Sequence, residues 1–277
     1  MYGTNNMKNL NESEKSNGVV VFAFNTDSID YVRIADQTSK LIEKNLGLPV
    51  TLITDKNSEP KFKYHNIIRI NNDHNDNVRT IDNVQYLWRN KGRYLAYELS
   101  PYDKTLLLDT DYLVLDSSLK DIFTLEFDYK IMQESTMASG NFPRTMGSLS
   151  HDWLWATVVF FTKSKKAELL FTLVKRIQEN YGYYRSLFHI SSNFRNDFAF
   201  AMADIILNGY ATDCKNYLPY KMFTVTEKLK NLEIKNNSIV IRQDTKADVS
   251  PIQNLHIIDK EFLLTENFQQ FVEHVTA

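Results

Sequence analysis

The chain has 277 residues, of which 43% are hydrophobic and 24% charged, and its formal net charge is −2 at pH 7. This composition is typical of a globular protein with a large buried core, and the charge excludes the global basic field of a non-specific nucleic-acid binder. The single Cys214 excludes an intrachain disulfide, and no apolar run approaches the roughly 20 residues of a membrane span.

The N-terminal residues 1–17 are polar and lack the apolar core of a signal peptide. We expect them to be a disordered leader, followed by one domain over residues 18–277, in a cytoplasmic protein. For a chain encoded by a phage, the compartment is the host cytoplasm.

The first part of the domain alternates between two hydrophobic patterns. Short apolar runs of β-prone residues predict buried strands, and apolar residues at helical spacing predict helices. The predicted strands cover 18–24, 49–54, 67–70, 104–108 and 112–115, and the predicted helices cover 29–46, 86–99 and 119–123. A strand, a helix and a strand in succession indicate a parallel sheet with right-handed crossovers.

The second part is less regular. We expect an aperiodic loop at 134–150, a strand at 155–161, helices at 167–180 and 197–207 with an aromatic and basic loop at 181–195 between them, strands at 239–241 and 255–258, and a C-terminal helix from 265. The whole pattern predicts a single α/β domain, with a mostly parallel central sheet flanked by helices.

Asp109, Thr110 and Asp111 directly follow the apolar strand at 104–108. In an open α/β sheet, ligands bind at the carboxyl ends of the strands. Carboxylates are the ligands that Mn²⁺ and Mg²⁺ prefer, and these ions bridge phosphate oxygens. A solvated turn is the alternative, but the apolar flanks on both sides favour a metal and diphosphate site.

Residues 102–115 resemble the metal-binding segment of the glycogenin-like glycosyltransferases, which have the GT-A fold, a Rossmann-like nucleotide-binding domain. The resemblance implies a nucleoside diphosphate sugar as donor, with UDP favoured, and Asp109 and Asp111 as metal ligands. It also implies that Tyr31 stacks on the base, that the turn at Phe24, Asn25 and Thr26 contacts the nucleoside, and that Arg93 contacts the donor phosphate or sugar.

Two later motifs extend the resemblance. His256-Ile257-Ile258-Asp259-Lys260 matches a His-x-x-Gly-Lys pattern, with Asp259 in place of glycine. It implies that His256 is the third metal ligand, which favours Mn²⁺ slightly over Mg²⁺, and that Lys260 binds the pyrophosphate. Asp152 keeps an acidic position of the group, where we expect a catalytic role, but Trp155 and Thr157 replace its Asn and Gly.

The acceptor side depends on residues 181–197. Asp197 opens a predicted helix, where an acidic residue is often only a cap. The resemblance makes it our candidate for orienting the sugar or for acting as a base. In the preceding loop, aromatic faces can stack on sugars or bases and cationic groups can reach phosphates. We assign the acceptor surface to Tyr184, Arg185, His189 and Arg195.

Sequence reasoning leaves two classes of function open. The first is a metal-dependent glycosyltransferase that acts on a hydroxyl acceptor. Because the Asn- and Lys-rich composition is typical of bacteriophage or low-GC bacterial proteins, this acceptor is either a saccharide or a hydroxymethylated base in phage DNA. The second is a nucleotidyltransferase-like or non-catalytic nucleotide-sugar-binding protein. Residues 25–28 lack the glycine and the basic residue of a nucleotidyltransferase phosphate loop, which favours the first class.

Overall fold

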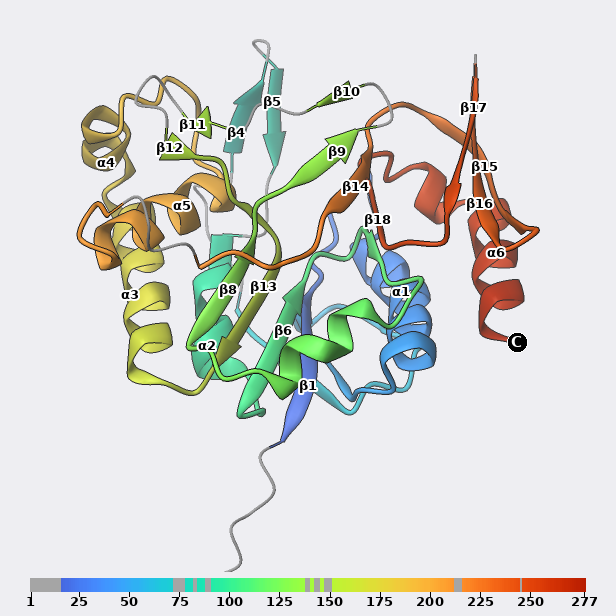
Figure 1. Cartoon of the computed structure of the whole chain (residues 1–277), viewed down its shortest axis with the longest axis horizontal. Coiled ribbons are helices and arrows are strands. Elements are labelled where there is room, and N and C mark those ends of the chain that lie inside the picture. The colour runs from blue at the N-terminus through green and yellow to red at the C-terminus, as the bar shows by residue number, and fades with distance from the viewer. Residues whose placement is uncertain are drawn as a thin grey trace, which may run out of the picture.

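The computed structural model describes residues 16–71, 78–81, 84–87, 91–137, 140–141, 145–146, 151–211, 216–244 and 246–277. A six-stranded sheet forms its centre (Figure 1). In spatial order its strands are β3 (Asn66–Arg69), β2 (Val50–Thr54), β1 (Asn17–Phe22), β6 (Lys104–Leu108), β13 (Trp155–Thr162) and β8 (Tyr129–Met132).

The direction of the strands decides which residues meet at the edge of this sheet. The pairs β1–β2, β1–β6 and β2–β3 are parallel, whereas β13 runs antiparallel to both β6 and β8. The amino end of β13 therefore lies beside the carboxyl end of β6. As a result, Trp155 at the start of β13 lies near Asp109, which follows β6.

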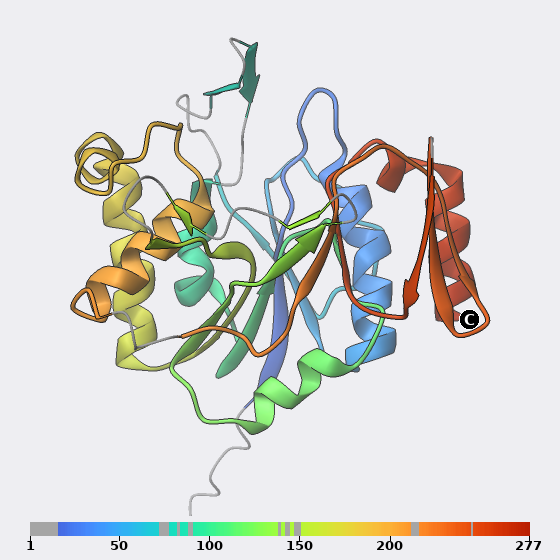
Figure 2. The same ribbon diagram turned by 45° about the horizontal axis from the view of Figure 1, so that its top comes forward.

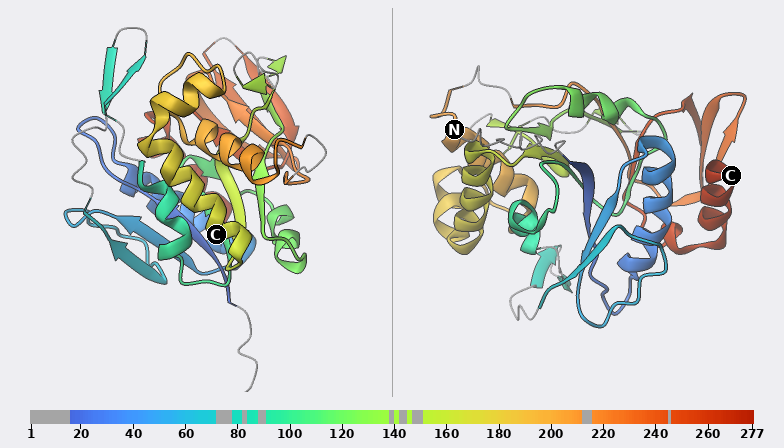
Figure 3. Two further views of the ribbon diagram at one scale, coloured as in Figure 1. Left: turned by 90° about the vertical axis from the view of Figure 1, so that its left-hand side faces the viewer. Right: turned by 90° about the horizontal axis from the view of Figure 1, so that it is seen from below.

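Helices cover both faces of the sheet, as the view from below in Figure 3 shows. Val20 and Leu107 point to the face covered by α3 (Lys165–Glu179) and α5 (Asn196–Leu207). Val19 and Leu106 point to the other face, covered by α1 (Tyr31–Leu46). Because successive side chains of a strand alternate between faces, the continuous apolar runs are the expected sequence of a sheet buried on both sides.

Local signals fix the ends of α1. The Asp30 carboxylate accepts the backbone N–H of Arg33 and so caps the amino end. Gly47 ends the helix at φ 64°, a left-handed conformation that glycine adopts without a Cβ clash. The prediction of a helix at 29–46 is thus confirmed, with its start two residues later.

A second, five-stranded sheet extends from the first at the site edge (Figure 2). Its strands, in spatial order, are β10 (Gly140–Asn141), β9 (Ser135–Met137), β14 (Met222–Val225), β18 (Leu255–Ile257) and β7 (Tyr112–Leu113). The antiparallel pairing of β18 with β7 sets His256 opposite Tyr112. This register brings the C-terminal motif to the segment that directly follows Asp111.

The C-terminal part forms a further layer beside α1. It consists of an antiparallel sheet of β15 (Leu229–Lys235), β16 (Ser238–Gln243) and β17 (Ala247–Pro251) together with α6 (Glu266–Thr276), and an apolar cluster joins β15, β16 and α6 to α1 and β7. The remaining elements are β4 (Val78–Ile81), β5 (Val84–Leu87), η1 (Lys91–Leu95), α2 (Ala96–Leu99), η2 (Ser118–Thr124), β11 (Thr145–Met146), β12 (His151–Asp152), α4 (Tyr181–Leu187) and η3 (Phe262–Leu264). No helix in the described part of the chain combines the length and apolarity that crossing a membrane requires.

The fold confirms the α/β prediction of a mostly parallel central sheet flanked by helices, but three local predictions are wrong. The described residues within 86–99 are the end of β5, the 3₁₀ helix η1 and the short helix α2 rather than one helix. The first half of the expected loop at 181–195 is α4, and the expected loop at 134–150 contributes β9, β10 and β11. Residues 1–15 of the expected leader lie outside the described residues, and Asn17 already belongs to β1.

Candidate active site

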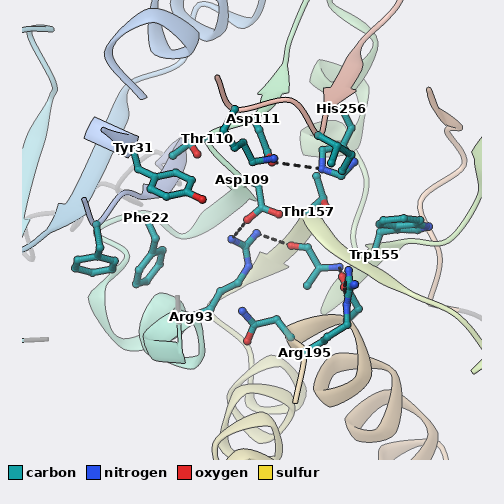
Figure 4. Close-up of a pocket in the computed structure, with 16 residues that line it drawn as sticks. Phe22, Tyr31, Arg93, Asp109, Thr110, Asp111, Trp155, Thr157, Arg195 and His256 are labelled. Carbon is teal, nitrogen blue, oxygen red and sulfur yellow. Dashed lines mark hydrogen bonds and ion pairs between the residues drawn. The ribbon is translucent and has the colours of Figure 1, made fainter. Parts of the chain in front are cut away.

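A pocket of about 270 Å³ opens where the carboxyl ends of β1 and β6 meet the amino ends of β13 and α5 (Figure 4). Elements from both sheets and from α1, η1 and α5 contribute to its wall. The lining residues are Phe22, Phe24, Tyr31, Arg93, Asp109, Thr110, Asp111, Trp155, Ala156, Thr157, Arg195, Asn196, Asp197, His256, Ile258 and Lys260.

Asp109 is held between β13 and a buried arginine. Its backbone N–H donates to the Thr157 carbonyl at 3.0 Å, which continues the β6–β13 pairing to the edge of the sheet. Its carboxylate pairs with Arg93 Nη1 at 2.5 Å, and Arg93 Nη2 donates to the Ala156 carbonyl. Arg93 is only 1% exposed, so this pairing compensates a charge that could not otherwise be buried. Burial raises the pKa of the Asp109 carboxyl, and the Arg93 guanidinium acts in the opposite direction.

Asp111 is more deeply buried and has a different set of neighbours. Its Oδ2 pairs with Lys260 Nζ and lies 3.6 Å from His256 Nε2, whereas its Oδ1 has no hydrogen-bond partner among the described residues. Burial by itself would raise the pKa of this carboxyl, but the charges of Lys260 and His256 outweigh it, so the pKa lies below its ordinary value. Asp111 is therefore held as an anion with one oxygen still available to a ligand.

Backbone pairing places the His256 and Lys260 side chains. The Ile257 N–H donates to the Asp111 carbonyl at 2.9 Å and fixes β18 against the segment Asp109-Thr110-Asp111. His256 Nδ1 lies 3.4 Å from Thr224 Oγ1, and the ring meets Trp155 edge to face at 5.8 Å between centroids, so Nε2 is the nitrogen beside Asp111. Lys260 Nζ also donates to the Ile257 carbonyl at 3.1 Å, which holds the ammonium close to Asp111.

These donors fit a divalent cation, although the described residues contain no group of three His, Cys, Asp or Glu side chains already gathered as a metal site. Arg93 and Lys260 instead compensate the two carboxylates. The Asp111 oxygen that lacks a partner and the imidazole nitrogen beside this carboxylate are the observations that support a metal here. Carboxylate oxygens with one imidazole nitrogen form a donor set that suits Mn²⁺ or Mg²⁺, with the imidazole favouring Mn²⁺.

One end of the pocket has an aromatic wall, where Figure 4 shows Phe22 and Tyr31, and Phe24 is a further aromatic lining residue. The turn that follows uses its polar side chains internally. Asn25 Oδ1 accepts the Val32 N–H at 2.9 Å, and Thr26 Oγ1 accepts the Ile29 N–H at 3.0 Å. The side chains of Asn25 and Thr26 therefore shape the start of α1 and do not line the pocket, whereas Phe24 and Tyr31 do.

Arg195 and Asp197 lie at the opposite end. Asp197 Oδ2 accepts from Arg195 Nε at 2.9 Å and from Nη2 at 2.7 Å, and Asp197 Oδ1 accepts the Ala156 N–H at 2.9 Å. Both carboxylate oxygens are thus occupied by fixed donors. This arrangement suits a positioning group better than a base that must accept a proton from a substrate.

The other predicted site residues do not line this pocket. Asp152 accepts the Tyr217 hydroxyl at 2.6 Å, and Arg185 donates to the carbonyls of Ile190 and Ser191. Tyr184 is half-buried and packs beside the cluster around α3 and α5, and His189 has a φ of 52° just after α4. Arg185 therefore stabilises its own loop in the described structure.

Sequence reasoning missed several residues of the pocket, namely Phe22, Trp155, Ala156, Thr157, Asn196 and Ile258. The strand prediction contained a usable signal for two of them. Trp155 and Thr157 both lie in the first three residues of β13, at the end of the strand that adjoins Asp109. The sequence by itself marks them only as departures from the family pattern.

No protein-family profile and no curated protein sequence matches this chain. Among solved structures, it is similar to the galactosyltransferase LgtC in complex with donor and acceptor sugar analogs, with a TM-score of 0.52 and 12% identity over 94% of this chain and 96% of LgtC. An active-site mutant of LgtC gives a TM-score of 0.50 and 13% identity over 92% and 94% of the two chains.

The glycosyltransferase GlyE of Streptococcus pneumoniae TIGR4 matches with a TM-score of 0.41 and 14% identity over 74% of this chain. The chain spans 45% of the length of GlyE. The likeness to LgtC extends over nearly the whole length of both chains. This chain therefore has the GT-A-like fold of the glycosyltransferases.

Proposed function

We propose that this chain is a metal-dependent glycosyltransferase that moves a sugar from a nucleoside diphosphate sugar to a hydroxyl group. The observation that carries the proposal is the convergence of Asp109, Asp111, His256 and Lys260 in one pocket of a glycosyltransferase fold. These residues come from segments about 150 positions apart in the sequence, and the pairing of β18 with β7, continued by the bond from the Ile257 N–H to the Asp111 carbonyl, brings the segments together.

The chemistry of the pocket suggests how a donor lies in it. The wall of Phe22, Phe24 and Tyr31 offers aromatic faces for a nucleobase, with UDP as the favoured nucleotide. The charged centre of the pocket, formed by Asp109, Asp111, His256 and Lys260, suits the diphosphate of the donor. The end with Arg195 and Asp197 is left for the transferred sugar and the acceptor (Figure 4).

Asp109, Asp111 and His256 are the residues that would hold Mn²⁺ or Mg²⁺. When bound, such an ion supplies positive charge that stabilises the departing diphosphate. Lys260 would add a second positive charge at the same place, because its ammonium already lies within the charged centre. Arg93 would keep Asp109 fixed while the Ala156 carbonyl fixes Arg93.

The acceptor is a hydroxyl of a saccharide or of a hydroxymethylated base in phage DNA. The net charge of −2 gives no long-range attraction to DNA, so a DNA acceptor would depend on local contacts near Arg195. A saccharide needs no such attraction. Parallel transfer assays on a simple saccharide and on hydroxymethylated duplex DNA separate the two acceptors.

Calorimetry of UDP binding with and without Mn²⁺ tests the proposal, together with a hydrolysis screen across nucleotide sugars. We expect affinity for UDP to require Mn²⁺ and to fall at least about tenfold in Asp111→Asn, since a metal ligand is lost. Asp128→Asn is the matched control, because Asp128 is exposed and does not line the pocket. Metal-independent binding that is unchanged in Asp111→Asn contradicts the metal site.

The same experiment addresses the alternative of a non-catalytic nucleotide-sugar-binding protein. Trp155 and Thr157, which stand in the pocket in place of the family's Asn and Gly, are the observation that favours it. Metal-dependent binding of UDP sugars without hydrolysis or transfer of any of them would support that alternative. Release of pyrophosphate from a nucleoside triphosphate would instead indicate a nucleotidyltransferase.

A further inference from the structure

We propose that Arg195 recognises an anionic group, a carboxylate or a phosphate, on the substrate that occupies the end of the pocket opposite the aromatic wall. The inference rests on the proposed function and specifies the chemical class of its substrate. It assigns to Arg195 the choice of substrate and to Asp197 and Trp153 the orientation of Arg195.

Arg195 differs from the other two strong bases of the pocket in its exposure and in its partners. Arg93 and Lys260 have side chains that are 1% and 19% exposed, and they pair with the carboxylates of Asp109 and Asp111, respectively. The Arg195 side chain is 34% exposed, and among the described residues it makes no hydrogen bond or ion pair with either of these carboxylates. It is therefore the strong base of the pocket that a second substrate group can reach.

The guanidinium of Arg195 is held in place before any ligand arrives. Asp197 binds it through Nε and Nη2, and its central carbon lies 5.3 Å from the centroid of the Trp153 ring. Trp153 is itself supported by Phe198 at 5.1 Å, with the rings edge to face. A planar cation fixed by an ion pair on one side and an aromatic face on another loses little freedom on binding.

Hydrogen bonds still remain to be made from this cation. A guanidinium has five N–H donors and no acceptor, and the contacts to Asp197 use only Nε and Nη2. Nη1 has no partner among the described residues. Since these donors are fixed and charged, they favour an acceptor that is itself charged and planar or tetrahedral, as a carboxylate or phosphate is.

Asp197 does not cancel this preference. Its carboxylate is 12% exposed on the side-chain scale and is also bound by the Ala156 N–H, so it faces the wall of the pocket more than its opening. The amino end of the 12-residue helix α5 lies at the same place, because Asn196 and Asp197 line the pocket. The partial positive charge of that helix end adds to the charge of Arg195.

The anionic group can come from two sources. A donor with a uronic acid carries a carboxylate on the transferred sugar, and a sugar phosphate carries a phosphate on the acceptor. Both place an anion beyond the diphosphate, at the end of the pocket where Arg195 lies. The chemistry that Arg195 recognises is the same in the two cases, so two experimental arms are needed.

The donor arm compares UDP-glucuronic acid with UDP-glucose by calorimetry in the presence of Mn²⁺. The acceptor arm compares glucose 6-phosphate with glucose as acceptors for the best donor found. In one of these arms we expect wild type to prefer the anionic compound by about tenfold, and Arg195→Gln to lose that preference, since a charge-assisted hydrogen bond is lost. Arg195→Lys, which keeps the charge without the planar fork, should retain part of the preference.

Controls separate recognition from folding. UDP affinity should be the same in wild type and Arg195→Gln, and Arg176→Gln, a change of an exposed arginine on α3, should leave all preferences unchanged. The inference is overturned if Arg195→Gln loses binding or turnover equally with neutral and anionic compounds. It is also overturned if wild type shows no preference for the anionic compound in either arm. Binding of UDP in the same experiments still upholds the proposed function. A wild-type protein that neither binds UDP nor turns over any donor overturns the proposed function and this inference with it.

Discussion

Replacement of Lys260 by methionine tests whether its ammonium stands in for a metal cation. In the absence of ligands, Lys260 Nζ pairs with Asp111 Oδ2, so the lysine compensates a carboxylate that is only 9% exposed on the side-chain scale. In Lys260→Met this charge loses its strongest partner, and His256 at 3.6 Å is left beside it. We expect the variant to be less stable without metal and to bind Mn²⁺ alone more tightly than wild type.

The size of the effect follows from burial. Removal of one member of a buried ion pair costs about 3–5 kcal/mol, because the remaining charge is left uncompensated. Lys260 is 19% exposed and His256 stays in place, so we take the lower end, about 3 kcal/mol. For a domain of this size each kcal/mol corresponds to about 2–4 °C, which gives a fall in Tm of about 6–12 °C.

Thermal unfolding in EDTA and across a Mn²⁺ titration measures both effects. Mn²⁺ should restore much of the lost Tm in Lys260→Met, whereas UDP affinity measured with Mn²⁺ should fall because the diphosphate has lost a cation. Lys228→Met is the control, since Lys228 and Glu261 form an exposed pair. An unchanged Tm in EDTA together with weaker Mn²⁺ binding would show that Lys260 does not compensate Asp111 and would refute the reasoning.

Substitutions of three further residues, two in the pocket and one outside it, follow from the described contacts. Arg93→Met removes the partner of Asp109 and of the Ala156 carbonyl, so thermal unfolding should show a loss of about 3 kcal/mol or more; Arg93→Lys should recover less than half of that loss, because a point charge cannot bridge both groups. Asp197→Asn can keep the bond from the Ala156 N–H but loses the ion pair with Arg195, so calorimetry should find UDP affinity unchanged and the preference for anionic substrates reduced. Arg185→Ala removes the donors to two loop carbonyls, so denaturant unfolding should show a loss of about 1 kcal/mol in stability. UDP binding should not change in this variant, and a loss of UDP binding would place Arg185 in the site.

The position of Asp109, Thr110 and Asp111 could be predicted from the sequence because the signal is local. A continuous apolar run specifies a strand buried on both faces, and a polar Asp-Thr-Asp directly after it must lie at a strand end. The structure places Asp109 and Asp111 there, in one pocket with Arg93, Lys260 and His256. Whether these groups bind Mn²⁺ is a separate matter that stays a prediction.

The parts that failed depend on contacts between distant segments. The second sheet consists of strands of two to four residues, and such strands have too few residues for a periodic pattern. The residues at 86–99 have apolar positions at helical spacing, yet the chain turns through η1 and carries Arg93 into the core, where its charge meets Asp109. Local propensity cannot identify Asp109, 16 positions further on, as the partner of Arg93.

The segment of Trp155, Ala156 and Thr157 explains why a departure from the family pattern does not break the geometry of the site. The Thr157 carbonyl accepts from Asp109, the Ala156 carbonyl accepts from Arg93, and the Ala156 N–H donates to Asp197. All three bonds use backbone atoms of this segment, so they constrain its path but not its side chains. Other side chains at positions 155 and 157 leave these three backbone bonds possible. Trp155 is only 4% exposed, belongs to a core cluster and meets His256 in the wall of the pocket, so a change at this position acts on the packing as well as on the wall.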